Sequence, residues 1–337
     1  MTYNRATLQK TSRIIALITA ISLPVIGVAN QSLTANEQTF IQTVSKQYKI
    51  PQAQVTDIVE HIHYNPDIIK KMTTPYEGLS WQKYRAHFIT TPRIHGGHFY
   101  QTQHANTFQQ AYQQFGVDQN TITAIIGVES FYGKHTGSYN VLDALGTLAF
   151  HYPPRAKFFQ KELQQYIVLS LKNDLPITTL KGSYAGALGI PQFMPSSYNH
   201  YAVPGKSQQA PVNLFTDHDD AIMSVGNFLK DAGWQRNQPV ACSITSDKTI
   251  SPTLVSKNTK PQHTLAWYAQ RQVSSACTQS LNPNTMAALV NMGNTATPDY
   301  WLVFKNFNAI MRYNPRINYA MAVFQLSQAI NVDRQHG

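Results

Sequence analysis

The chain has 337 residues, 42% of them hydrophobic and 13% charged, which is enough for one large domain or two to three small ones with a substantial core. The 27 Lys and Arg residues exceed the 17 Asp and Glu residues. The resulting charge of +10 suits an acidic polymer such as nucleic acid, an anionic glycan, a membrane surface, or simply a basic soluble surface. Because the basic residues are scattered and form no run, we expect no nucleic-acid partner.

The first 29 residues have the features of a secretory signal peptide. Arg5, Lys10 and Arg13 precede an apolar run at residues 14–28, and small residues at its end suit a cleavage site. Cleavage would remove three basic residues and lower the charge to about +7. The run is short for a membrane span and Pro24 interrupts it, so an uncleaved anchor is the less favoured alternative. No cysteine lies near it for lipid attachment.

Periodic apolar residues predict a mainly α-helical protein. From residue 35 to about residue 88 the pattern is amphipathic, and Pro51, Pro66 and Pro75 divide it into short helices. The segment TTPRIHGGH at residues 90–98 is predicted as a turn-rich connector. Five further helices are expected, and glycines end the first two of them: residues 106–116, 120–133, 155–172, 217–233 and 315–330.

Residues 235–298 differ from the rest in being rich in Ser, Thr, Asn, Gln and Pro, with β-like pieces at 240–244 and 253–255. We interpret them as a small strand-containing insertion, which makes the fold class mainly α with a minor β element (α+β). The only two cysteines, Cys242 and Cys277, lie in it without metal-ligand spacing. We expect them to form a structural disulfide, worth roughly 3–4 kcal/mol for a loop of about 35 residues.

The segment TITAIIGVESFYG at residues 121–133 places one carboxyl group, that of Glu129, at the end of an apolar helical run. We expect Asn120 or Thr121 to cap the start of this helix and Gly133 to close its end. A carboxyl group on so buried a helix either finds a hydrogen-bond donor or stays protonated, as a general acid must. Glu129 is therefore the leading candidate for catalysis, and a satisfied core residue is the alternative.

The segment KGSYAGALGIPQFMPSSY at residues 181–198 is dense in glycine, which lets a backbone pass close to a ligand or to another helix. It also contains two polar side chains, Ser183 and Gln192, and apolar surface from Phe193 and Met194. Pro195 can begin a new helix. This mixture is typical of a saccharide groove, although a glycine-rich junction between core helices has the same composition.

The segment RYNPRINYAMAVFQL at residues 312–326 contains Tyr313 and Asn314 directly before a helix that Asn314 can cap. Four apolar residues give this helix a buried face: Tyr319, Ala322, Val323 and Leu326. Taken alone, the segment predicts a well-capped core helix.

The order of these three segments closely resembles the lytic transglycosylase B family of bacterial peptidoglycan-cleaving enzymes. The resemblance includes WQKYRAHFIT (81–90), LDALGTLAFHYPPRAKFF (142–159) and DDAIMSVGNFLKDAGW (219–234), and it extends to about residue 330. It implies a lysozyme-like catalytic core. Together with the signal peptide and the insertion, this predicts five parts: a signal peptide at 1–29, an N-terminal helical part at 30–92 that packs with the C-terminal helix, the core at 93–234, the insertion at 235–299, and a segment at 300–337 that completes the groove.

The resemblance also implies a reaction. Glu129 matches the single catalytic acid of the family, which protonates the glycosidic oxygen between N-acetylmuramic acid (MurNAc) and N-acetylglucosamine (GlcNAc). The carboxylate then accepts the proton of the muramoyl C6 hydroxyl, which attacks C1 and leaves a 1,6-anhydro end. Ser183 matches a family residue that lies near the acid, and Gln192 matches a family residue that contacts the sugar. Four further residues match residues of the family's groove: Tyr84, Tyr313, Asn314 and Tyr319. We interpret the acids Asp143 and Glu162 as structural or surface residues.

The chain departs from the family pattern in two places. Phe228 stands where some relatives have a groove tyrosine, and residues 201–215 contain no acid where some relatives have an aspartate-rich calcium loop. We predict no calcium in that loop and no cofactor. Two close histidine pairs lack metal-ligand spacing, so we expect no metal there either: His61 with His63, and His95 with His98.

The resemblance implies a monomeric lytic transglycosylase, soluble in the periplasm after signal cleavage. Its partners would be peptidoglycan glycan strands, and a complex for cell-wall synthesis or degradation is a further candidate. Two alternatives stay open: a hydrolytic muramidase of the same fold, in which water replaces the C6 hydroxyl, and a catalytically weak peptidoglycan-binding scaffold protein. Phe228 and the missing calcium loop favour the scaffold, whereas the intact motif residues argue against it.

Overall fold

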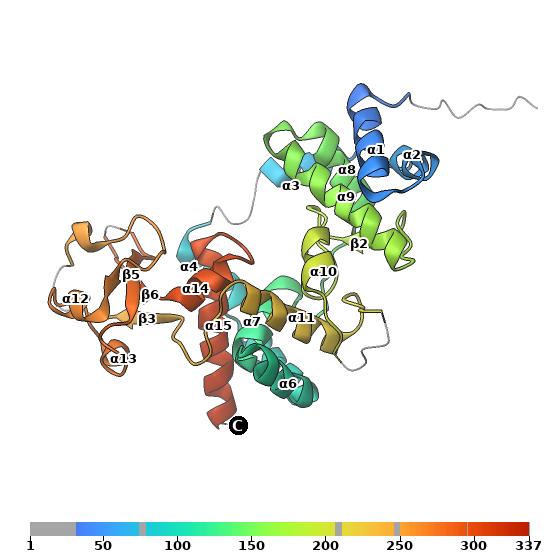
Figure 1. The fold of residues 1–337 in the computed structure, drawn as a ribbon. Helices are drawn as coiled ribbons and strands as arrows, with labels where there is room; N and C mark the ends of the chain where they lie inside the picture. The colour runs from blue at the N-terminus through green and yellow to red at the C-terminus, as the bar shows by residue number, and fades with distance from the viewer. Residues whose placement is uncertain (1–31, 74–78, 206–210, 246–249, 295, 337) are drawn as a thin grey trace, which may run out of the picture.

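The computed structural model describes residues 32–73, 79–205, 211–245, 250–294 and 296–336 (Figure 1). The predicted signal peptide and residues 206–210 of the loop expected to lack calcium lie outside them. Most described residues are helical and the strands are few and short, which confirms the mainly α fold class. The helices are α1 Ala35–Tyr48, α2 Gln52–Glu60, α3 Pro66–Thr73, α4 Trp81–Phe88, α5 Thr91–Gln103, α6 Ala105–Phe115, α7 Gln119–Ser130, α8 Val141–His151, α9 Ala156–Lys172, α10 Pro195–Tyr201, α11 His218–Asp231, α12 Leu265–Ala269, α13 Ala276–Gln279, α14 Lys305–Met311 and α15 Ile317–His336. The strands are β1 Tyr139–Asn140, β2 Lys181–Gly182, β3 Ala241–Ile244, β4 His263–Thr264, β5 Met286–Asn291 and β6 Tyr300–Val303.

The helices form two groups with the insertion to one side (Figure 1). In the first group, the α9 lobe, α8 and α9 pack together, α1 packs on α9 and α3 packs on α8. In the second group, the α15 body, α15 packs against α4, α5, α7 and α14, and α11 packs on α6 and α7. Helix α10 touches both α9 and α11. Within the predicted N-terminal helical part, α4 packs on the C-terminal helix α15, whereas α1 and α3 belong to the α9 lobe.

Helix α15 is the centre of the body. Seven of its residues are at most 2% exposed: Tyr319, Ala320, Met321, Ala322, Val323, Leu326 and Ile330. Ala320, Met321 and Ala322 are small or flexible enough to let neighbouring helices come close. Because this helix is apolar on several sides, it is buried by several helices. Its contact with α7, the helix that carries Glu129, brings residues 190 positions apart in the chain together.

Several predicted helix ends differ from the structure. The side chain of Asp118, rather than that of Asn120 or Thr121, caps α7 and accepts from the backbone N–H of Thr121 at 2.9 Å. Helix α7 ends at Ser130, so Gly133 lies outside it, after two residues with positive φ. Asn314 lies three positions before the first residue of α15, which is too early for an N-cap.

Two segments have a different secondary structure from the one predicted. Residues 90–98 largely belong to helix α5 and do not form a connector, with Pro92 in its first turn, where proline is tolerated. The side chains of Tyr132 and Ile330 pack tightly against Gly96 and Gly97 within that helix. Tertiary packing therefore outweighs the helix-breaking tendency of the two glycines. Residues Pro252–Leu254 form a 3-10 turn where a strand was expected.

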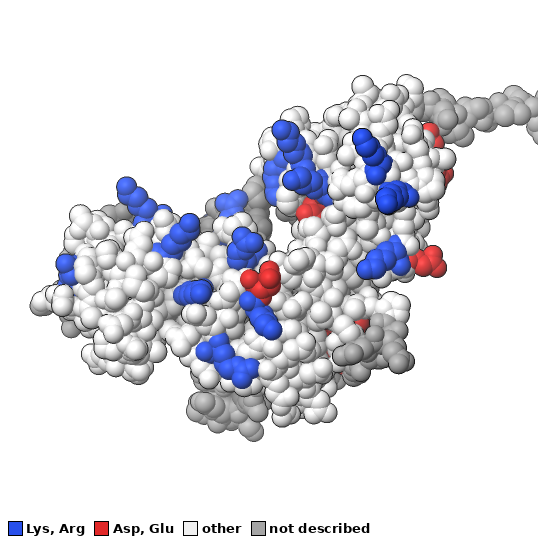
Figure 2. Space-filling view, in the orientation of Figure 1, with Lys and Arg blue, Asp and Glu red and all other residues white. Residues whose placement is uncertain are grey.

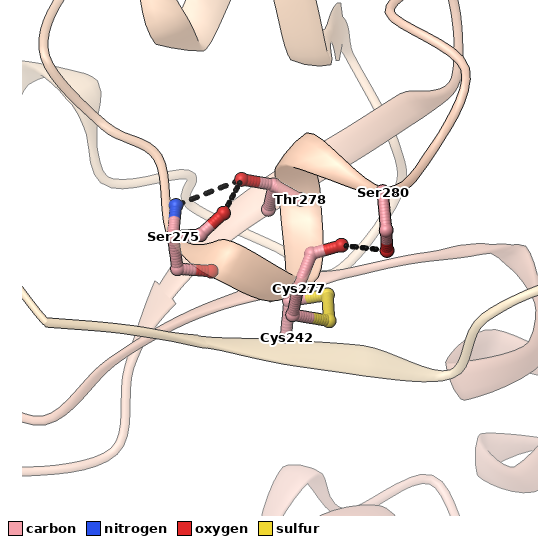
Figure 3. Close-up of a disulfide and its surroundings, with 5 residues drawn as sticks. All are labelled: Cys242, Ser275, Cys277, Thr278 and Ser280. Carbon is pink, nitrogen blue, oxygen red and sulfur yellow. Dashed lines mark hydrogen bonds between the residues drawn. A yellow bond between two sulfur atoms is a disulfide. The ribbon is translucent and has the colours of Figure 1, made fainter.

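The insertion is an antiparallel four-stranded sheet in the order β3-β6-β5-β4, with its own small core. Strand β6 pairs with both β3 and β5, so the sheet extends to Val303 and includes residues that the sequence placed in the C-terminal segment. Cys242 on β3 is bonded to Cys277 on α13, with their Cα atoms 5.8 Å apart (Figure 3). The disulfide thus ties a helix to the sheet.

Candidate active site

A cavity of about 690 Å³ lies between the α9 lobe and the α15 body. Figure 2 shows this face of the molecule hollowed between the two groups of helices. Side chains from both groups line the cavity. The body contributes Glu129, Phe228 and residues 312–316, and the lobe contributes Met72, Tyr152 and residues of α9. The glycine-rich segment between them contributes Tyr184, Ala185 and residues 192–194.

Glu129 lines this cavity at the last turn of α7 and is half-buried. Its Oε1 atom accepts a hydrogen bond of 2.6 Å from the hydroxyl of Tyr319 on α15. The next residue, Ser130, fixes the end of the helix, because its buried hydroxyl donates to the carbonyl of Ile190 at 2.6 Å. The carboxyl group is therefore held by α15, and the helix end that carries it is fixed to the glycine-rich segment.

The backbone around the site is strained. Phe131 and Tyr132 follow directly after α7 with φ of 50° and 59°, and Gln192 in the glycine-rich segment has φ of 51°. Non-glycine residues rarely adopt such values, and they cluster at functional sites where the surrounding structure holds them in place. Gly189 of the same segment, with φ of 65°, approaches the backbone of Leu214 so closely that a side chain would collide with it. This position requires glycine.

Three aromatic rings, those of Phe193, Phe228 and Tyr313, form one wall of the cavity, and the ring of Tyr319 packs behind them. The rings of Tyr313 and Phe228 lie 4.7 Å apart, those of Tyr313 and Phe193 5.7 Å apart, and those of Tyr313 and Tyr319 6.3 Å apart and nearly parallel. Burial, followed by the negative charge of Glu129, raises the pKa of Tyr313 and Tyr319 well above the ordinary value. Both hydroxyls therefore stay neutral and act as donors. Tyr319 donates to Glu129 and Tyr313 to the carbonyl of Pro191.

Not every predicted groove residue lines the cavity. Six of the nine predicted catalytic and groove residues do: Glu129, Gln192, Phe193, Met194, Tyr313 and Asn314. Gln192 uses its amide NH₂ to hold the carbonyls of Thr136 and Gly189. Tyr319 contacts Glu129 from behind, and Tyr84 is buried near Tyr319. The Ser183 hydroxyl accepts from the backbone N–H groups of Ala185 and Ala187, which shapes the turn and leaves Ser183 outside the lining.

A second carboxylate, that of Glu162 on α9, lines the same cavity and is 4% exposed. Its two oxygens accept from the backbone N–H and the hydroxyl of Ser196, at 2.9 and 2.7 Å. Glu162 therefore holds the start of α10. Asp143 accepts from the backbone N–H of His63 and lies outside the lining.

Several lining residues were not identified from the sequence. The guanidinium of Arg155 lies over the rings of Phe158 and Phe159, and Tyr184, Arg312 and Arg316 also face the cavity. The sequence around two of them, Arg155 and Tyr184, gave a weak indication of this position. Arg155 follows two prolines without an acidic partner nearby, and Tyr184 stands inside the glycine-rich segment.

The described ranges contain no group of three His, Cys, Asp or Glu side chains that could hold a metal ion. Within the same ranges, none of the helices is both long enough and apolar enough to cross a membrane.

Comparison with known proteins supports the expected family. The sequence profile described as "Transglycosylase SLT domain" matches residues 32–328. Membrane-bound lytic murein transglycosylase B of Escherichia coli is 33% identical over 309 residues, which cover 89% of this chain and 83% of that protein.

Solved structures of similar proteins have the same architecture. The soluble lytic transglycosylase SltB1 of Pseudomonas aeruginosa superposes with a TM-score of 0.81 at 34% identity, covering 89% of this chain and 99% of that one. The Escherichia coli transglycosylase Slt35, solved in complex with bulgecin A, gives 0.80 at 33% identity over 89% of this chain and 94% of that one. Pseudomonas aeruginosa SltB3, solved in complex with NAG-NAM-pentapeptide, gives 0.78 at 26% identity over 88% of this chain and 78% of that one. Because the profile and the sequence identity each extend over most of its length, the chain belongs to the SLT-domain family of lytic transglycosylases that includes lytic murein transglycosylase B.

Proposed function

We propose that this protein cleaves the β-1,4 bond between MurNAc and GlcNAc in peptidoglycan and leaves 1,6-anhydroMurNAc ends, with Glu129 acting first as acid and then as base. The observation that carries this proposal is the different use of the two carboxyl groups that line the cavity. Both oxygens of Glu162 are committed to Ser196. Glu129 accepts a hydrogen bond from the hydroxyl of Tyr319 and lines the cavity. One carboxyl group is thus placed to exchange a proton with a glycan.

Glu129 can supply both steps. In the first, its protonated carboxyl group gives a proton to the glycosidic oxygen as the C1–O bond breaks, and the substrate's own acetamido group can stabilise the positive charge at C1. In the second, the carboxylate takes the proton from the C6 hydroxyl, whose oxygen bonds to C1 and closes the anhydro ring. The proton count of Glu129 is restored, and no water is consumed.

The environment supports both forms of the acid. The C-terminal end of a helix concentrates partial negative charge, which favours the neutral acid, and Glu129 lies in the last turn of α7. The Tyr319 hydroxyl donates to Glu129 and favours the carboxylate. These opposing influences suit a group that must change protonation state twice in each cycle.

The test is product analysis after digestion of purified peptidoglycan. We expect anhydro ends by mass spectrometry, and we expect Glu129→Gln to lower turnover by about 10²–10⁴-fold, since the amide cannot cycle a proton. Reducing muramic ends in place of anhydro ends would instead indicate a hydrolytic muramidase. Full activity of the Glu129→Gln variant would remove Glu129 from the mechanism.

A matched control is Glu162→Gln. The amide oxygen of glutamine still accepts one bond from Ser196, so we expect slower turnover but unchanged anhydro products. A loss as deep as that of Glu129→Gln would show that two carboxyl groups take part.

We place the action of the protein in the periplasm on glycan strands, based on its family and on the predicted signal peptide. Fractionation of cells that produce the full chain would test this placement.

A further inference from the structure

A second cavity, of about 630 Å³, adjoins the candidate active site on the α9 lobe. The two cavities share Glu162 and Ser196 in their linings. The rest of the second cavity is built from α9 and from the end of α1. The two cavities therefore adjoin each other at the contact between Glu162 and Ser196.

One face of α9 forms the floor of this second cavity. Five residues spaced at i, i+3, i+4, i+7 and i+8 line it, which places them on the same side of the helix: Lys157, Gln160, Lys161, Gln164 and Gln165. All five are polar. A helix face that packed only against protein would be apolar at this spacing. This face instead offers amide donors and acceptors together with two ammonium groups.

The end of α1 forms the opposite wall. The hydroxyl of Tyr48 accepts from the side-chain amides of Gln47 at 3.1 Å and Gln165 at 2.9 Å. The bond from Gln165 fixes the end of α1 against α9, so the wall is held in place without a bound ligand.

The cavity has an excess of positive charge. Lys157 and Lys161 are both exposed and stand one helical turn apart, a like-charge arrangement that weakens a helix. In the described part of the chain neither lysine has an ion-pair partner. Among the described lining residues the only acid is Glu162, and both of its oxygens are committed to Ser196. Figure 2 shows basic side chains on the α9 lobe.

We propose that this second cavity binds the acidic stem peptide of a MurNAc residue whose glycan strand lies in the active-site cavity. Stem peptides carry free carboxylates and repeated amide groups. Lys157 and Lys161 would bind a carboxylate between them, and Gln160 and Gln164 would bind the peptide amides. This inference rests on the proposed function only in that the active-site cavity must hold a glycan strand.

Binding measurements with an uncleaved ligand test the inference. In the Glu129→Gln background, a GlcNAc–MurNAc tetrasaccharide with pentapeptides is compared by calorimetry with the same tetrasaccharide without peptide. We expect tighter binding of the peptide-bearing ligand. Changing Lys157→Gln together with Lys161→Gln should weaken binding of that ligand about fivefold, since exposed ion pairs are individually modest, and should barely change binding of the bare one.

Lys172→Gln is the matched control. Lys172 is exposed on the same helix, roughly 16 Å along the axis from Lys161, and lies outside the second cavity. It should change neither affinity. Added salt should reduce the preference for the peptide in the parent protein but not in the double variant.

Two results would overturn the inference. They are an unchanged affinity of the double variant for the peptide-bearing ligand, and an equal loss for both ligands, which would make the cavity a sugar site. The proposed reaction is tested by a different assay. Hydrolytic products after digestion would refute the anhydro mechanism, whereas the binding affinities would still test the second cavity.

Discussion

Tyr313 and Tyr319 have nearly parallel rings but donate their hydroxyls to different acceptors. Tyr319 donates to the Glu129 carboxyl group at 2.6 Å, whereas Tyr313 donates to the backbone carbonyl of Pro191. A comparison of the two residues therefore separates two roles: contact with the acid, by Tyr319, and support of the cavity wall, by Tyr313.

We predict that Tyr319→Phe lowers kcat/KM for peptidoglycan by about 10–100-fold. A hydrogen bond to a charged group is worth roughly 1.5–3 kcal/mol, and each 1.4 kcal/mol corresponds to a factor of ten. Tyr313→Phe is the control and should cost clearly less. Turnover assays with thermal melts check this prediction, and equal losses in the two variants would contradict it.

At the scale of elements, helix α7 is fixed by a different residue at each end. Asp118 caps the start through the backbone N–H of Thr121, and Ser130 ties the end to Ile190 in the glycine-rich segment. Only the second contact adjoins Glu129. The start of the helix serves stability, and its end also positions the acid.

We predict that Asp118→Ala lowers the free energy of unfolding by about 1 kcal/mol and leaves kcat/KM within about twofold, because a lost N-cap acts locally. Ser130→Ala leaves the buried Ile190 carbonyl without this donor and should cost about 1–3 kcal/mol of stability. It should also lower kcat/KM several-fold. Urea denaturation and turnover assays on both variants test this, and similar turnover in the two would refute the positional role of Ser130.

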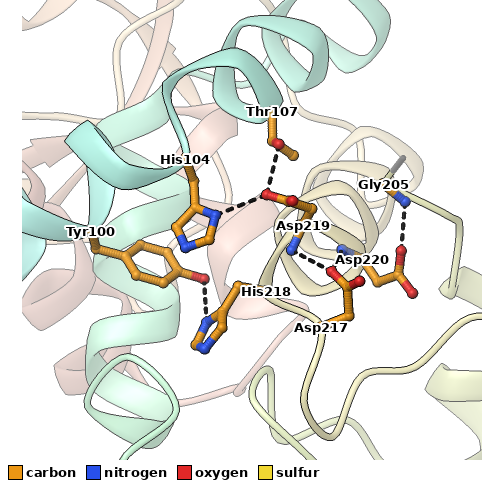
Figure 4. Close-up of polar contacts among 8 residues, drawn as sticks. All are labelled: Tyr100, His104, Thr107, Gly205, Asp217, His218, Asp219 and Asp220. Atoms are coloured by element: carbon orange, nitrogen blue, oxygen red, sulfur yellow. Dashed lines mark hydrogen bonds and ion pairs between the residues drawn. The ribbon is translucent and has the colours of Figure 1, made fainter. Parts of the chain in front are cut away.

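At the scale of the whole molecule, a cluster around His104 and His218 joins α5, α6 and α11 (Figure 4). Asp219 accepts from His104 at 2.8 Å and from Thr107 at 2.7 Å, and His218 contacts the hydroxyl of Tyr100 at 3.1 Å. Burial, followed by the charge of His104, lowers the pKa of His218 below 6.5, although Asp217 and Asp219 act in the opposite direction. The folded protein therefore favours neutral His218.

This shift predicts a stability that falls in acid. Below pH 6.5 the unfolded chain binds a proton at His218 before the folded protein does, so the free energy of unfolding decreases as the pH falls. One such group contributes at most about 1.4 kcal/mol per pH unit. Urea denaturation between about pH 5 and pH 8 should show this slope, and His218→Gln should reduce it. His61→Gln, at the exposed C-cap of α2, is the control. An identical dependence of the free energy of unfolding on pH in the two variants would contradict the assignment to His218.

Local patterns predicted much of the fold. The apolar spacing at residues 155–172 and 217–233 corresponds closely to α9 and α11, and Gly116 ends α6 with a positive φ as expected. Residues 90–98 were predicted wrongly, because the packing of Tyr132 and Ile330 on two glycines is a long-range contact. The extent of the insertion was misjudged for the same reason, since the pairing of β6 with β3 and β5 joins distant segments.

The sequence by itself singled out Glu129, since one acid at the end of an apolar helix and beside glycine-rich and Tyr-Asn segments is a local pattern. Only the tertiary structure decided which groups surround it. The contact of α7 with α15 brings Tyr319 to the acid, and the bonds of Glu162 to Ser196 commit the second carboxyl group to holding α10. The second cavity between α1 and α9 was likewise not visible in the sequence. Distances between side chains on different helices are set by packing, which no local pattern contains.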